Sequence, residues 1–247
     1  MAVGKVHLVG AGPGHPDLLT IKAAALLKTA DVVVYDRLIQ PGVLDLAKPE
    51  AERVFMGKHL GGPDSSQRQI NELLVEKARA GKMVVRLKGG DPFMFGRGGE
   101  EAAYLVAHAI PFEVVPGVSS AMAAPLRALI PVTHRGVAAC VAFATGHEAE
   151  EEGTRLDWGA LARIPTVVFM MGVGHVRQIS TRLIEGGRAG STPVAIVQQA
   201  YWDDERVVTS TLAAVADDVD RLGIRPPATL VVGEVVRLRA TLRGSES

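Results

Sequence analysis

The sequence predicts an α/β fold on three observations. Short runs of aliphatic and β-branched residues alternate along the chain with segments whose apolar residues recur at helical spacing. Several of the short runs are apolar at consecutive positions, as expected of strands that helices cover on both faces. The length of 247 residues suits one large or two small domains. Together these features are typical of α/β layers.

The expected strands are the short apolar runs. They lie at residues 6–9, 32–35, 83–87, 112–115, 137–144, 166–171, 194–198 and 230–232. The run 137–144 holds the single cysteine of the chain, Cys140, which we therefore expect to be a buried and unreactive strand residue. A single cysteine excludes a disulfide framework and a cysteine-rich metal site, and we expect no bound metal.

The segments between these runs have helical character. Asp17 is the expected N-cap of a helix that begins within LLTIKAAALLK. Residues 66–69 (SQRQ) are interpreted as a capping box, after which an apolar helical face begins at Ile70.

A domain boundary is expected where a proline-glycine turn follows the strand at 112–115. It divides the chain into an N-terminal domain, residues 1–116, and a C-terminal domain, residues 117–247. The second domain carries an acidic segment at 147–157, which we expect to be a solvated loop.

The charges of the chain balance, with 27 Lys and Arg against 27 Asp and Glu. Such a protein has no net field that would attract nucleic acid or an anionic membrane, so an anionic ligand must be held by local cations. The N-terminus lacks a basic region followed by a long apolar stretch, and no window reaches the ~18 uncharged apolar residues of a membrane span. We therefore expect a cytoplasmic protein without nucleic-acid or membrane partners.

The stretch VGAGPGHPDLLT (9–20) admits two interpretations. Glycines between an apolar run and a helix, with Asp36 ending the next run, are typical of a dinucleotide-binding turn. However, Pro13 and Pro16 have no N–H to offer a pyrophosphate. The glycines also stand apart from the helix N-terminus on which a phosphate site depends. The nucleotide interpretation is therefore weakened.

A second glycine cluster, RLKGGDPFMFGRGGEEA (86–102), also follows a strand and precedes a helix. Gly89 and Gly90 let the backbone approach a ligand closely, and Asp91 with Pro92 sets a turn. Two such loops at the carboxyl ends of strands define a crevice of the kind in which open α/β sheets bind ligands.

Further motifs occur in order along the chain. They are YDRL (35–38), MGK (56–58), VPGVSSA (115–121), IPVTHRG (130–136), FATGH (143–147), VVFMMG (167–172), TPVAIV (192–197) and VVGEVV (231–236). With the two glycine clusters, they resemble the tetrapyrrole methylases over about residues 5–239. Within that family, YDRL together with FGRGGEE is similar to the members that act on uroporphyrinogen III.

The resemblance implies two α/β domains with the active-site cleft between them, assembled as a homodimer. It implies S-adenosyl-methionine as the cofactor, with S-adenosyl-homocysteine as its product. Uroporphyrinogen III would receive two successive methyl groups, at C2 and C7, and leave as precorrin-2 for sirohaem or cobalamin synthesis. No dehydrogenase–ferrochelatase extension precedes the first motif, so we expect the reaction to stop at precorrin-2.

The resemblance also implies the site residues. Those expected at the cofactor are Pro13, Gly89, Gly90, Asp91, Met94, Ser119, Ser120, Met171, Ala200 and Ala228. Asp36 is the implied proton acceptor and Lys58 the implied proton donor, which suits a reaction in which the methylated ring sheds a proton. Arg37 and Arg97 are expected to bind substrate carboxylates, because a guanidinium pairs with a carboxylate through two parallel hydrogen bonds.

Three other functions fit part of the sequence. The first is a methylase of the same family that acts on a later precorrin. The second is an NAD-dependent oxidoreductase, which GAGPG and Asp36 would support. The third is a tetrapyrrole carrier without catalysis. A methylase should bind S-adenosyl-homocysteine and ignore NAD, whereas a carrier has no need of both Asp36 and Lys58.

Overall fold

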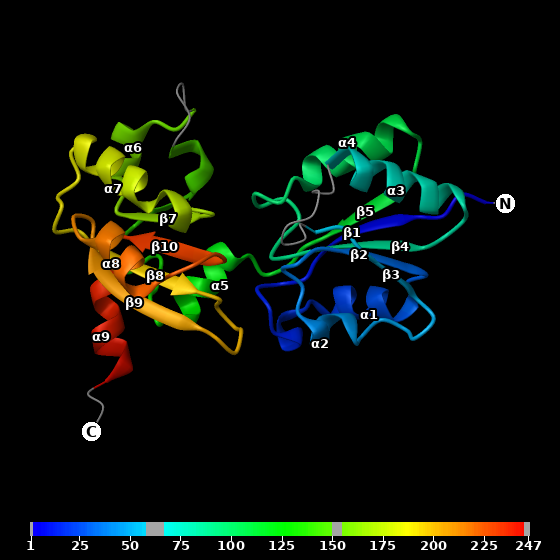
Figure 1. Ribbon diagram of the computed structural model, residues 1–247, viewed down its shortest axis with the longest axis horizontal. Helices are drawn as coiled ribbons and strands as arrows, with labels where there is room; N and C mark the ends of the chain where they lie inside the picture. The colour runs from blue at the N-terminus through cyan, green and yellow to red at the C-terminus, as the bar shows by residue number, and fades with distance from the viewer. Residues whose placement is uncertain (1, 58–66, 150–154, 245–247) are drawn as a thin grey trace. The chain divides into compact units, whose positions relative to one another are not determined.

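The chain folds into two compact units in this computed structural model, which describes residues 2–57, 67–149 and 155–244. Unit 1 comprises Met1–Ser119 and unit 2 comprises Ser120–Ser247. Each unit is a sheet with helices on both faces (Figure 1). Across the described residues, no helix is both long enough and apolar enough to span a membrane.

Unit 1 is built on a five-stranded parallel sheet with the strand order β3-β2-β4-β1-β5. Its strands are β1 (Val6–Gly10), β2 (Val32–Tyr35), β3 (Glu52–Phe55), β4 (Val84–Lys88) and β5 (Phe112–Val115). Because all five strands run the same way, their carboxyl ends meet at one edge of the sheet. The loops that follow the strands are therefore brought together at that edge.

Helices cover both faces of this sheet (Figure 1). They are α1 (Ile21–Thr29), α2 (Pro41–Leu44), α3 (Gln67–Arg79) and α4 (Gly98–Ala107), with a short 3-10 turn η1 at Pro16–Leu18. Alternate residues of β4 divide between the two faces, so that Val85 and Leu87 pack with α1 while Val84 packs with α3 and α4. Both faces of the strand are buried, as the continuous apolar runs predict.

Unit 2 is built on a five-stranded mixed sheet with the order β6-β7-β10-β8-β9. Its strands are β6 (Val141–Thr145), β7 (Thr166–Met170), β8 (Pro193–Gln198), β9 (Arg206–Thr211) and β10 (Ala228–Val232). Only β6 and β7 pair in parallel, and the pairs β7–β10, β10–β8 and β8–β9 are antiparallel. The carboxyl ends of β7 and β8 therefore lie at the same edge as the start of β10.

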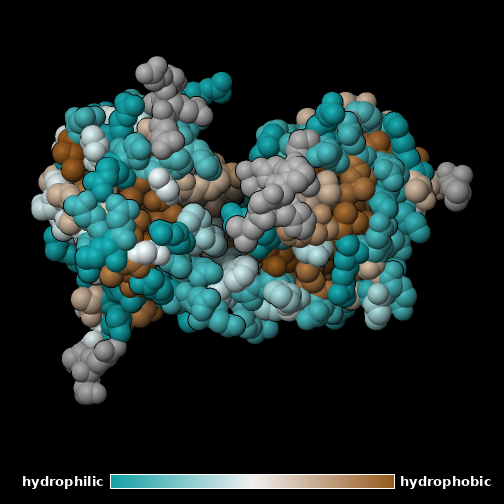
Figure 2. Space-filling view, in the orientation of Figure 1, coloured by the Kyte–Doolittle hydropathy of each residue, from teal (hydrophilic) through white to brown (hydrophobic). Residues whose placement is uncertain are grey.

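The helices of unit 2 also lie on both faces of its sheet. They are α5 (Ser120–Arg127), α6 (Trp158–Arg163), α7 (Val176–Glu185), α8 (Val215–Leu222) and α9 (Leu238–Arg243), with 3-10 turns η2 (Gly146–Ala149), η3 (Val173–His175) and η4 (Glu234–Arg237). Trp158 stacks on the buried Phe169 beneath α6 and α7, with ring centroids 5.9 Å apart. Hydrophilic residues cover most of the visible surface of both units (Figure 2).

Two local sequence predictions were wrong. The first helix begins at Ile21 and not near Asp17, because the Thr20 hydroxyl accepts the N–H of Ala23 at 3.1 Å and caps the helix there. Cys140 is exposed and precedes β6. The start of its apolar run folds into a turn that His134 and Ala138 close by backbone hydrogen bonds.

Two predicted features lie partly outside the described residues. The helix predicted after the capping box is α3, with Ile70 buried, but Ser66 lies outside the described residues. The acidic segment 147–157 begins as η2 with Ala149 buried, and residues 150–154 lie outside the description.

Candidate functional site

The two glycine clusters of unit 1 lie side by side at the carboxyl edge of its sheet. The N–H of Gly90 donates to the carbonyl of Gly12 at 2.7 Å, and the N–H of Gly12 donates to the carbonyl of Gly90 at 3.1 Å. Ala11 donates to the carbonyl of Lys88 at 2.8 Å. The loops after β1 and β4 therefore form one backbone platform, with φ of +72° at Gly12 and +69° at Gly90, which glycine adopts without strain.

A third loop, after β5, closes on this platform. A Cβ added to Gly10 would lie 2.5 Å from the nitrogen of Gly117 and 2.7 Å from the carbonyl oxygen of Gly90. A Cβ added to Gly117 would meet that same carbonyl oxygen. The backbones thus approach more closely than any side chain would allow, which explains the glycines at these positions.

Asp91 joins the second loop to the third. One oxygen of its carboxylate, Oδ1, accepts the N–H of Phe93 at 2.9 Å, and the other, Oδ2, accepts the N–H of Gly117 at 3.1 Å. The Asp91 carboxylate therefore holds the backbones of the second and third loops together, and it places a negative charge at the platform. Met94 follows in the same loop and is half-buried.

The platform lacks the features of a phosphate site. Helix α1 begins only at Ile21, so its free amides lie beyond the glycines and beyond η1. Within residues 10–19, 89–96 and 116–119, the only charged side chains are Asp17 and Asp91. A nearby acid, with no Lys or Arg in these three ranges, suits a cationic ligand such as a sulfonium better than a pyrophosphate.

Asp36 follows β2 at the same edge of the sheet. Its Oδ1 accepts the N–H of Leu38 at 2.9 Å, and its Oδ2 lies 3.7 Å from Nη2 of Arg86. The side chain is 25% exposed, so the carboxylate is fixed by these partners and still reachable. Arg37, the next residue, is exposed. Lys58, the predicted proton donor after β3, lies outside the described residues.

Arg97 is exposed at the N-terminus of α4. Its Nε and Nη2 donate to the two carboxylate oxygens of Glu100 at 2.8 and 2.6 Å. These hydrogen bonds raise the pKa of Arg97 above its ordinary value. The guanidinium is charged and available at the surface, although one carboxylate already occupies its fork.

A buried charged cluster beneath this edge was missed by the sequence analysis. Arg86, Lys88 and Glu101 are 4%, 5% and 0% exposed. Oε1 of Glu101 accepts from Nζ of Lys88 at 2.9 Å, from Nε of Arg86 at 3.2 Å and from Nε2 of Gln67 at 3.2 Å. Burial, followed by the charge of Arg86, lowers the pKa of Lys88, and Glu101 opposes that shift.

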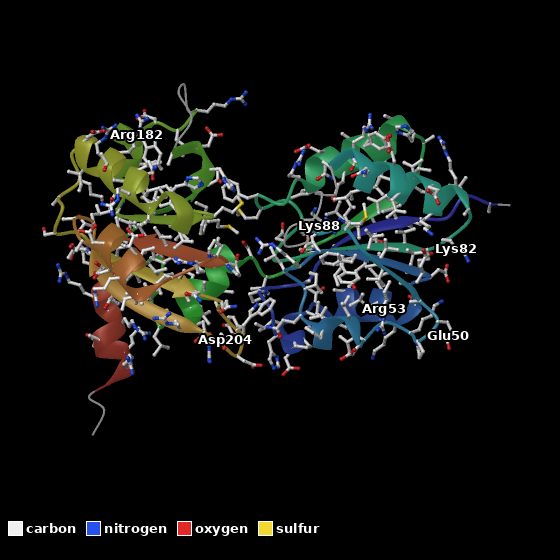
Figure 3. All side chains as sticks on the ribbon, viewed as in Figure 1. Glu50, Arg53, Lys82, Lys88, Arg182 and Asp204 are labelled. Carbon is white, nitrogen blue, oxygen red and sulfur yellow. The ribbon has the colours of Figure 1, made fainter. Side chains whose placement is uncertain are left out.

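A signal for this cluster was present in the sequence. Arg86 and Lys88 occupy alternate positions of a strand whose other residues are apolar, so both point to one covered face. Charges on a buried face require a partner, and the helix that follows this strand carries two acids, Glu100 and Glu101, in its first turn. Figure 3 labels Lys88 at the carboxyl end of β4.

The predicted cofactor residues of unit 2 also gather at one sheet edge. Met171 follows β7, Ala200 follows the end of β8, and Ala228 begins β10, paired with Gln198. Positive φ values occur here at Met171 (+52°), Gln199 (+49°) and Tyr201 (+67°), and such values are uncommon outside glycine. Met171 is 42% exposed and Ala200 is buried.

Ser119 and Ser120 mark the passage between the units. Ser119 is buried at the end of unit 1, and Ser120 begins α5 in unit 2. The sequence placed the boundary after residue 116, and the compact units divide after Ser119.

Comparison with known proteins gives one family. Residues 5–216 match the family model described as tetrapyrrole (corrin/porphyrin) methylases. An S-adenosyl-L-methionine-dependent uroporphyrinogen III methyltransferase from Methanosarcina barkeri is 49% identical over 241 residues, which are 97% of this chain and 94% of that protein. A siroheme synthase from Azotobacter vinelandii is 50% identical over 98% of this chain, and the match spans about half of that relative, 52% of its length.

Solved structures give the same result. A uroporphyrin-III C-methyltransferase from Thermus thermophilus, in complex with S-adenosyl-homocysteine, matches with a TM-score of 0.81 at 46% identity over 95% of this chain and 94% of that one. A cobalt-precorrin-4 methyltransferase matches with a TM-score of 0.83 at 31% identity, over 94% of this chain and 95% of that one.

Proposed function

This chain belongs to the tetrapyrrole methylase family, and from that premise we propose that it is an S-adenosyl-methionine-dependent C-methyltransferase of uroporphyrinogen III. It adds two methyl groups in succession, at C2 and C7, and releases precorrin-2 for sirohaem or cobalamin synthesis. The relative from Methanosarcina barkeri, which matches along nearly its whole length, supports this substrate. The lower identity to the cobalt-precorrin-4 methyltransferase supports it over a later precorrin.

The observation that carries the proposal is the backbone platform of unit 1. Its loop backbones are held together by paired hydrogen bonds, and the charged side chains within residues 10–19, 89–96 and 116–119 are the acids Asp17 and Asp91. S-Adenosyl-methionine, when bound, supplies an electrophilic methyl group on a sulfonium cation. We propose that Pro13, Gly89, Gly90, Asp91 and Met94 hold it in unit 1. Met171, Ala200 and Ala228 are the proposed adenosine-binding positions of unit 2, and Ser119 and Ser120 add contacts at the passage between the units.

The proposed roles of the other residues follow from the chemistry of the substrate. Bond formation between a pyrrole carbon and the methyl group leaves the macrocycle with a positive charge, which it loses as a proton. Asp36 is the proposed acceptor of that proton, because its carboxylate is held in place and partly exposed. Lys58 is the proposed proton donor. Arg37 and Arg97, both exposed, are the proposed partners of the acetate and propionate groups.

The decisive experiment is an anaerobic incubation of the protein with uroporphyrinogen III and S-adenosyl-methionine, analysed by product mass and absorption spectrum. A gain of two methyl groups, with an isobacteriochlorin-type spectrum after oxidation, would support the proposal. Tight binding of S-adenosyl-homocysteine without methylation would redirect it to a later precorrin. Binding of NAD in place of S-adenosyl-homocysteine would refute the methylase proposal in favour of an oxidoreductase.

The role of Asp36 is tested by Asp36→Asn. We expect kcat to fall by about 10²- to 10⁴-fold, which is the contribution typical of a positioned proton acceptor. The dissociation constant of S-adenosyl-homocysteine, measured by titration calorimetry, should stay unchanged. Asp45→Asn, an exposed acid after α2 in the same unit, is the matched control and should retain full activity. A wild-type kcat for Asp36→Asn would remove this residue from the mechanism.

We further propose that the enzyme works as a homodimer in the cytoplasm. Support for the dimer comes from the family resemblance, and a reducing compartment suits a chain with a single, exposed cysteine, Cys140. Light scattering coupled to size-exclusion chromatography gives the mass directly. A mass of 26.1 kDa, that of one chain, would refute the dimer.

A further inference from the structure

We propose that Arg86 is a positioning residue that orients the Asp36 carboxylate, and that the buried Glu101 anchors it. This inference rests on the proposed function, because it takes Asp36 to be the proton acceptor. It assigns a task to a buried charged cluster that neither cofactor binding nor substrate binding requires. All the residues concerned belong to unit 1.

The charged cluster lies on a sheet face that is otherwise packed with apolar residues. Arg86 and Lys88 point from β4 to the face that α3 and α4 cover, where Val84 forms part of an apolar core. Buried charges are costly unless they are paired, and an apolar pair of similar volume commonly serves stability as well or better. Stability by itself is therefore a weak reason for two buried cations at this place.

The contacts of Arg86 link the helix layer to the end of β2. Its Nε donates to Oε1 of Glu101 in the first turn of α4 at 3.2 Å. On the same edge of the guanidinium, Nη2 lies 3.7 Å from Oδ2 of Asp36, and Nη1 faces the carbonyls of Val34 at 3.5 Å and Leu87 at 3.3 Å. The planar fork of one arginine thus spans from Glu101 to the strand that carries Asp36.

Glu101 does not need Arg86 for its own pairing. Its Oε1 already accepts from Lys88 and Gln67, so that three donors converge on one oxygen. Its other oxygen, Oε2, is buried without a hydrogen-bond partner in the described part of the chain. An arrangement that served only to satisfy Glu101 would divide the donors between both oxygens. The observed one instead gives all three donors, the guanidinium of Arg86 among them, to Oε1.

Asp36 is hydrogen-bonded at one oxygen and forms an ion pair with Arg86 at the other. Its Oδ1 accepts the N–H of Leu38, which fixes the side chain against its own turn, and Oδ2 faces Arg86. With 25% of the side chain exposed, free lone pairs remain for a reactant. Arg86 therefore limits the rotation of a group whose orientation matters for proton transfer.

The test is a double-mutant cycle on kcat, with Asp36→Asn, Arg86→Met and the combined variant, measured at saturating uroporphyrinogen III and S-adenosyl-methionine. Arg86→Met alone should lower kcat by about 10- to 100-fold, the size of effect that a misplaced reacting group produces. The same change in the Asp36→Asn background should produce no further loss, because Arg86 acts through Asp36. The dissociation constant of S-adenosyl-homocysteine should be the same in all four proteins.

Two results would overturn the inference and leave the proposed function intact. One is an equal loss of kcat from Arg86→Met in both backgrounds, which would mark a general effect on the fold. The other is a wild-type kcat for a folded Arg86→Met protein. A wild-type kcat for Asp36→Asn would instead overturn the role of Asp36, and this inference with it.

Two further variants keep the test decisive if Arg86→Met does not fold. Arg86→Lys keeps the charge but loses the fork that spans from Glu101 to Asp36, so kcat should still fall by about 10-fold. A wild-type kcat for Arg86→Lys would overturn the inference. Arg188→Met is the matched control, since Arg188 is a partly buried arginine of unit 2 that donates to the carbonyls of Leu161 and Pro165. It should lower the melting temperature and leave kcat unchanged.

Discussion

The two units reach their proposed sites by different sheet geometries. In unit 1, the parallel sheet delivers the ends of β1, β2, β4 and β5 to one edge, with charged groups such as Asp36 and Arg86 beneath and beside the loops. In unit 2, antiparallel pairing alternates the strand ends, so its edge combines the ends of β7 and β8 with the start of β10. The proposed site residues there, Met171, Ala200 and Ala228, are all apolar.

This difference indicates that the two units have different roles in the proposed function. A parallel sheet collects many loops at one edge, and the buried ion pairs of unit 1 fix charged groups among them. The edge of unit 2 contributes backbone in uncommon conformations, at Met171, Gln199 and Tyr201, and an apolar surface. We therefore expect changes in unit 1 to alter chemistry and loop position, and changes in unit 2 to act through packing.

The largest expected effect on stability comes from the core of unit 2. Phe169 is fully buried and stacks on Trp158, so Phe169→Ala should lower the free energy of unfolding by about 3–5 kcal/mol. Both tryptophans, Trp158 and Trp202, lie in unit 2, so denaturation followed by tryptophan fluorescence reports on this unit. Phe169→Leu is the control and should cost less, because it leaves a smaller cavity. Equal losses in the two variants would contradict the packing argument.

The next effect tests the backbone platform of unit 1. Gly117→Ala places a Cβ against the carbonyl of Gly90, and the resulting overpacking should cost about 1–3 kcal/mol. The shifted loop should also weaken S-adenosyl-homocysteine binding at least tenfold, as measured by calorimetry. Gly99→Ala is the control, because Gly99 lies in α4 with open space around it. That change should raise stability by about 0.5–1 kcal/mol. If Gly117→Ala binds S-adenosyl-homocysteine as tightly as wild type, the position of this loop does not matter for cofactor binding.

The smallest effect concerns the opposite end of the unit 1 sheet. Glu113 accepts from Lys22 and Lys5, and these hydrogen bonds lower its pKa to about 2. A carboxylate with a lowered pKa stabilises the folded state above its ordinary value of 4.5, and this contribution is lost as the pH falls from there to about 2. Because the group is partly exposed, salt should weaken the effect.

The measurement is acid unfolding followed by circular dichroism, in wild type and in Glu113→Gln. The variant should lose stability near neutral pH and show a shallower dependence on pH between 4.5 and about 2. Its kcat should stay at the wild-type value, since Glu113 lies at the amino ends of the strands. Identical acid transitions in the two proteins would show that the pairing contributes nothing to stability.

Most of the fold could be predicted because interior strands are apolar on both faces. The prediction missed two edge strands, β3 (Glu52–Phe55) and β9 (Arg206–Thr211), which are half-exposed and carry no continuous apolar run, although it found the edge strand β5. The same weakness explains the error at Cys140, since β6 is also an edge strand and the apolar residues before it form a turn.

The sequence predicted which loops form the site, but it did not predict which side chains contact one another there. Glycine spacing and strand ends brought Gly90 and Asp36 to one edge, because parallel strands leave no alternative. The contact between Arg86 and Glu101 depends on how α4 packs on β4, and local sequence does not determine that geometry. Lys58, for its part, lies outside the described residues.

The late start of α1 affects which ligands can compete for the glycine platform of unit 1. A glycine loop at a helix N-terminus binds the phosphate groups of nucleotides. Here Thr20 caps the helix beyond the glycines, and within residues 10–19, 89–96 and 116–119 the charged side chains are Asp17 and Asp91. We therefore expect ATP and NAD to compete weakly at this platform with a ligand that carries a positive charge.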